Sequence, residues 1–207
     1  DYRELRQLLR CREDYVQLGK TAKQRIKALL LFAYLYPLTQ EIPANFSGRY
    51  IQQLKSIPCS PAIRMRLDML LADLEYSRQQ NLKVIKELQL ICEQDVRLKN
   101  NIHCLRSIPG IGFIIAVTLL ASIGDPEKLK NPRELGAFIG LVPSEHSTGE
   151  KVSKGHITHL GNSILRSLLI EAGWMTIRKD TRLQQFYDRI RNKHHPSVGA
   201  RKAIVAV

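Results

Sequence analysis

The stretch SPAIRMRLDMLLADLEYSRQQNLKVIKELQLICEQDVRLKNNIHCLR, residues 60–106, decides the fold class that the sequence predicts. Apolar residues recur along it at alternating spacings of four and three, as in the buried seam of a coiled coil. The thirteen seam positions are Ile63, Leu67, Leu70, Leu74, Ser77, Asn81, Val84, Leu88, Ile91, Asp95, Leu98, Ile102 and Leu105. Ten of them are aliphatic. The pattern predicts one helix of about 45 residues, roughly 65 Å long. Its start is marked by Ser60, a capping residue, and Pro61, which suits the first helical position.

Three seam positions are polar: Ser77, Asn81 and Asp95. Such residues weaken packing but can fix the register or the number of partner helices. The seam is compatible with two partners. One is a second copy of the chain, which would give a homodimer or a higher homo-oligomer through the coiled coil. The other is the helical segment 1–36 of the same chain.

The remaining segments also favour helices, and none of them predicts a strand. Periodicity and capping signals indicate helices at about 1–36, within 37–59, after the PGIG turn within 107–123, and at 132–139, 162–179, 181–193 and from near Gly199 onward. We therefore expect a mainly α protein, in which a long coiled-coil helix precedes a compact helical domain. The expected division is a dimerisation segment at 1–106 and a C-terminal domain at 107–207.

The composition favours a polyanionic partner. The 207 residues carry a net charge of +13, which points first to nucleic acid and second to an anionic membrane surface. No stretch reaches the ~18 apolar residues of a membrane-spanning helix. The four cysteines show no CxxC spacing, and the adjacent His194 and His195 have no cysteine close by in the sequence, so no metal site is predicted. The same cysteine pattern predicts a reduced, cytoplasmic chain. The start without Met and the apolar end favour a fragment of a longer protein.

The pentapeptide Ile108-Pro109-Gly110-Ile111-Gly112 lies between two predicted helices. Its two glycines allow a tight turn and bring backbone amides close to a phosphate, and the next helix adds its positive N-terminus. This arrangement is typical of a helix-hairpin-helix that grips the DNA backbone without reading its sequence. A glycine-rich turn without a ligand is the simpler interpretation.

Positive charge is concentrated from Glu150 onward, where eleven Lys and Arg stand against four Asp and Glu. A solvated basic face is the ordinary explanation of such a segment, but a phosphate-binding surface explains the asymmetry better. The basic residues that recur along its predicted helices are Arg166, Arg178, Lys179, Arg182, Arg189, Arg191, Lys193, Arg201 and Lys202.

The loop GLVPSEHSTGEKVSKGHITHLGN, residues 140–162, combines hydroxyls, glycines and cations. Attack on phosphorus needs an exposed hydroxyl and positive charge for the developing anion. Ser147 and Thr148, followed by Lys151 and Lys154, are of those types. Runs of this kind are usually plain turns, so the pattern alone assigns no nucleophile.

Two stretches resemble a known family: RSIPGIGFIIAVTLLASIGD, from residue 106, and LGAFIGLVPSEHSTGEKVSKGHITHLGNSILRSLLIEAGW, ending at residue 174. Together they are similar to the C-terminal transposase domain of the DEDD-type insertion-sequence transposases, relatives of the Piv/MooV invertases that are also described as bridge-RNA-guided recombinases. The order of PGIG, GLVP, Ser-Thr-Gly, Lys, Gly-x-x-Thr and Gly-Asn-x-x-Leu-Arg carries the resemblance. The C-terminal GARKAIVAV resembles the family's last helix, and residues 1–106 take the place of its central dimerising segment.

The resemblance implies an intact protein with an N-terminal RuvC-like domain, whose four acidic residues bind Mg²⁺ and which we expect this chain to lack. It also implies a serine that becomes joined to DNA, for which Ser147 corresponds best and Thr148 and Ser144 less well. His159 stands where the family often has Lys, and that charge is lost here. With the hairpin glycines and Lys154 added to the matching motif positions, the residues expected to bind nucleic acid are Gly110, Gly112, Lys151, Lys154, Thr158, Asn162 and Arg166.

The sequence thus favours the C-terminal part of a DNA transposase or recombinase that binds DNA and a guide RNA and is inactive alone. The alternative is a non-catalytic dimeric DNA-binding module that uses the same hairpin and basic surface. Asn162 also has two interpretations, as a nucleic-acid contact or as the cap of the helix that follows it.

Overall fold

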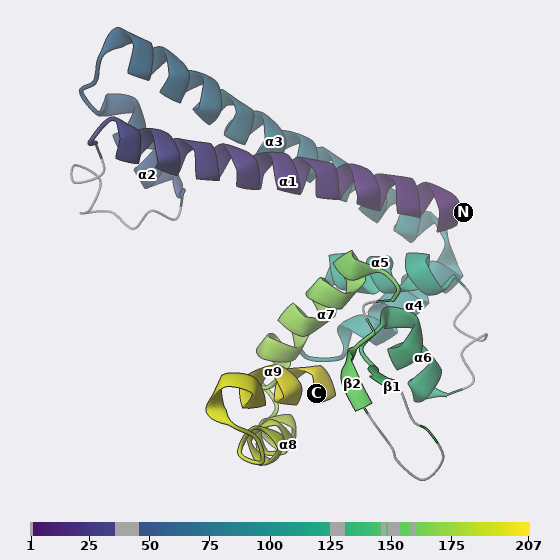
Figure 1. The fold of residues 1–207 in the computed structure, drawn as a ribbon. Helices are drawn as coiled ribbons and strands as arrows, with labels where there is room; N and C mark the ends of the chain where they lie inside the picture. The colour runs from purple at the N-terminus through teal and green to yellow at the C-terminus, as the bar shows by residue number, and fades with distance from the viewer. Residues whose placement is uncertain (1, 36–45, 125–130, 146–147, 149–153, 159) are drawn as a thin grey trace. The chain divides into compact units, whose positions relative to one another are not determined.

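A computed structural model of the chain describes residues 2–35, 46–124, 131–145, 148, 154–158 and 160–207. The described residues are mainly helical, as predicted (Figure 1). The chain divides into two compact units, one of residues Gln7–Ile91 and one of Asp1–Arg6 with Cys92–Val207. The second unit begins before residue 107 because Leu105 packs into the cluster formed by Leu119 and Leu165. The functional division into 1–106 and 107–207 stays a prediction.

The unit of residues 7–91 is a helical hairpin with a short third helix. Helices α1 (Tyr2–Phe32) and α3 (Pro61–Gln94) lie side by side, and α2 (Gly48–Ser56) packs near one end of the pair (Figure 1). Its buried cluster includes Ala22, Ile26, Leu30, Tyr50, Leu54, Leu67, Leu70, Leu71 and Leu74. The predicted seam therefore packs against α1 of its own chain over these positions. Self-association through the coiled coil stays a prediction.

The predicted single helix over 60–106 is wrong, because the helix is interrupted at Asp95. Helix α3 ends at Gln94, and α4 (Val96–Arg106) begins two residues later. Asp95 has an extended backbone, and its carboxylate accepts a hydrogen bond of 3.0 Å from the Leu98 amide. A short carboxylate that binds a free amide stabilises the start of a new helix rather than the middle of an old one.

The described residues of the other unit form α4 and the helices α5 (Phe113–Ile123), α6 (Pro132–Ile139), α7 (Ser163–Thr176), α8 (Thr181–Arg191) and α9 (Pro196–Ala206). One buried cluster joins α5, α6 and α7 through Leu119, Ile139 and Leu165. The last helix starts at Pro196, earlier than predicted, because proline occupies its first turn and the His195 side chain accepts from the Ser197 amide. Gly199 then lies inside α9, where a Cβ would meet the Arg191 carbonyl oxygen at 2.5 Å.

A pair of short strands contradicts the expectation that no strand is present. Strand β1 (Pro143–Glu145) pairs antiparallel with β2 (Lys154–Ile157), with Pro143 opposite Ile157 and Glu145 opposite Lys154. The register shifts between Pro143 and Glu145. Strands of three and four residues are too short for an alternating pattern to be distinctive, and their pairing is a contact across the chain.

Candidate nucleic-acid interface

The two strands form the base of the loop that the sequence singled out. Because Glu145 pairs with Lys154, the two ends of segment 146–153 are held next to each other. The Thr158 amide extends the pairing with a hydrogen bond of 3.0 Å to the Val142 carbonyl oxygen. Thr148 is exposed. Ser147 and Lys151, which the sequence assigned to the reaction and to nucleic acid, lie outside the described residues.

Two glycines fix the path of the chain on either side of the strand pair β1–β2. Gly140 follows α6 with φ +77°, and Gly161 has φ +93°, both in the left-handed region that favours glycine. A Cβ on Gly140 would collide with the Leu160 carbonyl oxygen, and one on Gly161 with the Phe138 carbonyl oxygen. The segment after α6 and the segment before α7 therefore pack backbone against backbone.

Arg166 joins the same two segments. Its guanidinium donates from one nitrogen to the Ile139 carbonyl oxygen at 3.0 Å and to the Leu160 carbonyl oxygen at 3.3 Å. The side chain is half-buried. This arginine, predicted to bind nucleic acid, thus binds one carbonyl group at the end of α6, where the helix dipole is negative, and one in the segment before α7. Its contact with a phosphate stays a prediction.

Asn162 is the N-terminal cap of α7, so that interpretation of the residue is confirmed. Its Oδ1 accepts from the amides of Ile164 and Leu165 at 3.0 and 3.2 Å. Its Nδ2 donates to the Ser122 hydroxyl of α5 at 3.2 Å. The amide thus connects three segments. Ser122 was not singled out in the sequence, because nothing in its helical context marks it.

A serine lies against a glycine across the strand pair. A Cβ on Gly155 would collide with the hydroxyl oxygen of Ser144, so the absence of a side chain at residue 155 makes room for that hydroxyl. Close by in the sequence, the Thr158 hydroxyl oxygen is buried without a hydrogen-bond partner. Thr158, predicted to bind nucleic acid, is half-buried at the end of β2.

The two glycines of the PGIG turn, between α4 and α5, have different surroundings. Gly110 has φ +92°, and a Cβ there would lie 2.5 Å from the Thr176 hydroxyl oxygen and 2.6 Å from the Ala172 carbonyl oxygen. The Thr176 hydroxyl also donates to the Pro109 carbonyl oxygen, so the turn is packed against α7. Gly112 is exposed at the start of α5, and within the described part of the chain no atom lies within 4 Å of a Cβ position and no side chain caps the helix. The first glycine serves packing, and the second leaves the N-terminus of α5 open.

Helices α8 and α9 form a strongly basic pair. Residues 178–202 hold eight Lys and Arg against two Asp, which is a net charge of +6. Both acids are engaged, since Asp180 caps α8 and Asp188 lies 3.8 Å from Arg191. The exposed basic side chains are Arg178, Lys179, Arg182, Arg189, Arg191, Lys193, Arg201 and Lys202.

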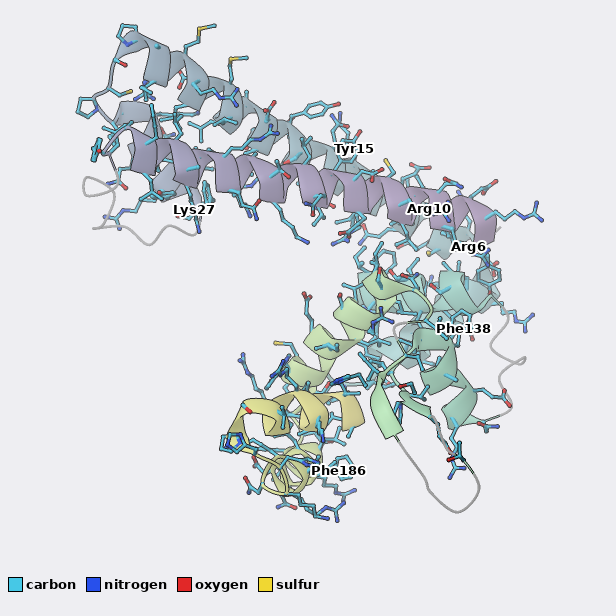
Figure 2. All side chains as sticks on the ribbon, viewed as in Figure 1. Arg6, Arg10, Tyr15, Lys27, Phe138 and Phe186 are labelled. Carbon is cyan, nitrogen blue, oxygen red and sulfur yellow. The ribbon has the colours of Figure 1, made fainter. Side chains whose placement is uncertain are left out.

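An aromatic ring and a concave site accompany these charges. The Arg189 guanidinium lies 5.2 Å from the ring centre of Phe186, which is labelled in Figure 2. A depression of about 520 Å³ at the corner between α8 and α9 is lined by Arg191, Asn192, His194, Pro196 and Ala200. Basic side chains beside an aromatic ring are the residue types that contact phosphates and bases.

The described residues contain neither a candidate metal site nor a membrane-spanning helix. No group of three His, Cys, Asp or Glu in that part of the chain is arranged to hold a metal ion. Its helices include none that is both long and apolar enough to cross a membrane.

Known proteins similar to this chain are described as transposases of insertion sequences. Residues 102–188 match the profile described as "Transposase IS116/IS110/IS902 family". The chain is 29% identical over 180 residues to the transposase for insertion sequence element IS1111A of Coxiella burnetii, covering 86% of this chain and 48% of that protein. It is 27% identical over 183 residues to the transposase for insertion sequence element IS1328 of Yersinia enterocolitica, covering 86% of this chain and 54% of that protein.

A third relative is the pilin gene-inverting protein of Moraxella bovis, 31% identical over 98 residues, or 46% of this chain and 30% of that protein. The chain thus spans about half the length of the two transposases that it matches over most of its own length. The matched region, residues 102–188, holds the PGIG turn, the strand pair and the Gly140–Gly161–Arg166 contacts. Those residues match the profile of the IS116/IS110/IS902 transposase family, and the chain is similar to insertion-sequence transposases along most of its length.

Proposed function

We propose that this chain is the C-terminal part of a DNA transposase or recombinase whose Ser147 attacks a phosphodiester. The observation that carries the proposal is the pairing of Glu145 with Lys154, which brings together the ends of the segment that contains the serine. A short segment with fixed ends presents few conformations to a substrate, which lowers the entropy lost when a nucleophile is aligned. The match to the transposase profile supports the reaction class.

The proposed step is an exchange of one phosphate ester for another. The Ser147 hydroxyl loses its proton to a base, and its oxygen forms a bond to phosphorus. The bond from phosphorus to one sugar oxygen breaks, and that sugar oxygen takes up a proton. A sugar hydroxyl from another strand then attacks the phosphoserine, which restores the serine and joins the strands. Lys151 and Lys154 would stabilise the charge on the phosphate oxygens.

Binding of DNA, and of a guide RNA, is assigned to two surfaces. The open N-terminus of α5 at Gly112 offers free amides to a backbone phosphate. The basic pair α8–α9 offers exposed cations, whose contribution falls as salt rises. The strand pair β1–β2 lies between these two surfaces in the sequence. It is held in place by contacts of Thr158, Asn162 and Arg166.

The metal-dependent part of the reaction is proposed to lie elsewhere in the intact protein. The described residues contain no cluster that fits Mg²⁺. We assign the four carboxylates and the Mg²⁺ to a RuvC-like domain, and pairing of subunits to residues 1–106.

The test is a full-length transposase that contains this chain, incubated with end-labelled DNA and analysed on a denaturing gel. We expect a covalent protein–DNA adduct that Ser147→Ala abolishes. Ser144→Ala and Thr148→Ala are the comparison variants and should leave the adduct in place. Normal strand exchange by the Ser147→Ala protein would reject the nucleophile, and loss in Thr148→Ala alone would move it by one residue.

A non-catalytic DNA-binding module is the second candidate. The observation in its favour is that Gly110, Asn162 and Arg166 all support the fold. In that case DNA binds to the same basic surface, but no covalent adduct forms in the intact protein. The same gel therefore separates the two functions.

A further inference from the structure

The seam between α1 and α3 changes character near its middle. On one side lies the apolar cluster that contains Ile26 and Leu70. Beyond it, Gly19 of α1 faces Ser77 of α3 so closely that a Cβ on the glycine would lie 2.9 Å from the serine oxygen. Ser77 is only 2% exposed, and its hydroxyl donates to the Leu74 carbonyl oxygen at 2.7 Å. A polar section thus replaces hydrophobic packing at this point.

A cavity of about 220 Å³ opens beside this section. That volume is about seven times the roughly 30 Å³ that one water molecule occupies in the liquid. The cations that line the cavity are Lys20, Lys23 and Arg78, and its polar side chains are Tyr15, Ser77 and Asn81. No carboxylate is among its lining residues in the described part of the chain. Figure 2 labels Tyr15 on α1.

Among the described residues, one of the three cations in the cavity has an acidic partner: the Lys20 ammonium lies 4.0 Å from Glu13. The Lys23 ammonium lies 5.9 Å from the ring centre of Phe46, and Arg78 donates to the Phe46 carbonyl oxygen at 2.6 Å. Among the described residues, neither Lys23 nor Arg78 makes an ion pair. Two cations that converge on one residue repel each other unless an anion lies between them.

Asn81 adds an unmet hydrogen-bonding group. Within the part of the chain that the structure describes, its Oδ1 is buried without a hydrogen-bond partner, which is costly for a polar atom. Rotation of the amide by 180° would turn its NH₂ to the same place, where it can donate to an anionic oxygen. Tyr15 also lines the cavity, but its hydroxyl shares a hydrogen bond with Tyr76, which raises the pKa of Tyr15.

We propose that this cavity binds a phosphate group between Lys23, Arg78 and Asn81. The group is either a backbone phosphate of a nucleic-acid strand or a free phosphate ion. The site lies outside residues 102–188, which match the transposase profile, and does not depend on the chemistry of Ser147. Both cations supply charge-assisted hydrogen bonds to the phosphate oxygens, and the amide supplies a neutral one.

The experiment is a titration of the ¹⁵N-labelled 207-residue chain with sodium phosphate, followed by NMR and compared with sodium chloride at equal ionic strength. Saturable shifts are expected for the backbone amides of Gly19 and Ser77 and for the Asn81 side chain. Lys23→Gln should weaken phosphate binding about tenfold. The matched control is Lys27→Gln, one helical turn further along α1 at an exposed position, and should change it less than about twofold.

Asn81→Leu separates a loss of phosphate binding from a loss of folding. This variant removes the unpaired oxygen, so it should keep or raise the melting temperature while it loses the phosphate-dependent shifts. Equal shifts with phosphate and chloride, equal effects of Lys23→Gln and Lys27→Gln, or unchanged binding in Asn81→Leu would each overturn the proposal.

A single-stranded oligonucleotide then identifies the source of the phosphate. Competition with phosphate for the Gly19 and Ser77 signals assigns the site to a nucleic-acid backbone. Phosphate binding that the oligonucleotide leaves unchanged assigns it to the free ion. Neither result depends on the covalent adduct, so failure of the nucleophile and failure of this site are distinguishable.

Discussion

The carbonyl oxygen of Leu160 occupies the space that a Cβ on Gly140 would need. This contact joins the end of α6 to the segment before α7, and Arg166 donates to carbonyl groups on both sides of it. The strand pair that carries the candidate serine segment begins three residues after Gly140. The position of the strand pair therefore depends on a contact between two backbone segments that leaves no room for a side chain at residue 140.

Gly140→Ala should destabilise the protein strongly. The new methyl group would collide with a backbone oxygen, and the left-handed φ is unfavourable for alanine, so we expect the free energy of unfolding to fall by about 3 kcal/mol. Gly136→Ala is the matched control in the same helix, since its Cβ would lie 3.5 Å from a Val142 methyl group. It should be neutral or stabilising by up to about 1 kcal/mol. Urea unfolding followed by circular dichroism measures both, and equal stabilities would contradict the prediction.

Arg166→Met should lower stability before it affects DNA binding. The change leaves two carbonyl groups without their donor, which costs about 1.5–3 kcal/mol for bonds to a charged group. Arg182→Met, at an exposed position of α8, should stay within about 0.5 kcal/mol of the parent but weaken DNA binding at low salt. Thermal unfolding and fluorescence anisotropy with labelled DNA check the pair. A stable Arg166→Met protein that no longer binds DNA would return this arginine to the phosphate-binding set.

Gly155→Ala should be rescued by a second change. Alone, the new methyl group meets the Ser144 hydroxyl and should cost about 1–3 kcal/mol. With Ser144→Ala the hydroxyl oxygen is gone, and the next atoms, the Cβ and the carbonyl oxygen of residue 144, both lie at an ordinary 3.8 Å. The double variant should recover most of the loss, giving a clear interaction energy in a double-mutant cycle. Additive losses would mean that the two residues do not meet across the strands.

Gly112→Ala tests the helix-hairpin-helix. No atom lies within 4 Å of the new Cβ, so stability should change by about 1 kcal/mol or less, the typical effect at a helix cap. If a DNA phosphate approaches the amides there, the methyl group should reduce affinity several-fold in an anisotropy titration. Unchanged affinity would leave the hairpin as a packing turn. Gly110→Ala is expected to unfold this region instead, because its Cβ would collide with α7.

The cysteines should differ widely in reactivity. Burial, together with the charges of Asp95 and Glu93, raises the pKa of the Cys92 thiol to about 11. Since only the thiolate reacts, Cys92 stays protonated and unreactive at pH 8 in the folded protein. Cys104 is exposed and should react first. Timed iodoacetamide labelling with peptide mass spectrometry gives the order, and early labelling of Cys92 would show that its surroundings open readily.

Helix boundaries show how far local signals reach. Helix α6 spans Pro132–Ile139, as predicted, because Asn131, Pro132 and Gly140 mark its two ends within the chain itself. Asp95 carries an equally local signal, a capping side chain, yet the sustained heptad spacing around it favoured one continuous helix. Side-chain periodicity does not reveal a break when the apolar face continues on both sides of it. Here Leu88 before the break and Leu98 after it are both buried.

The sequence by itself determined the helical class, both ends of α6, the capping role of Asn162 and the resemblance to the transposases, since each of these depends on residues close together in the chain. Tertiary structure alone decided that Arg166 binds the carbonyl group of Ile139, that β1 pairs with β2, and that α1 covers the seam of α3. Those outcomes depend on which distant groups meet. A hydrogen-bond donor such as Arg166 suits a phosphate and a carbonyl oxygen equally well until the fold brings one of them within reach.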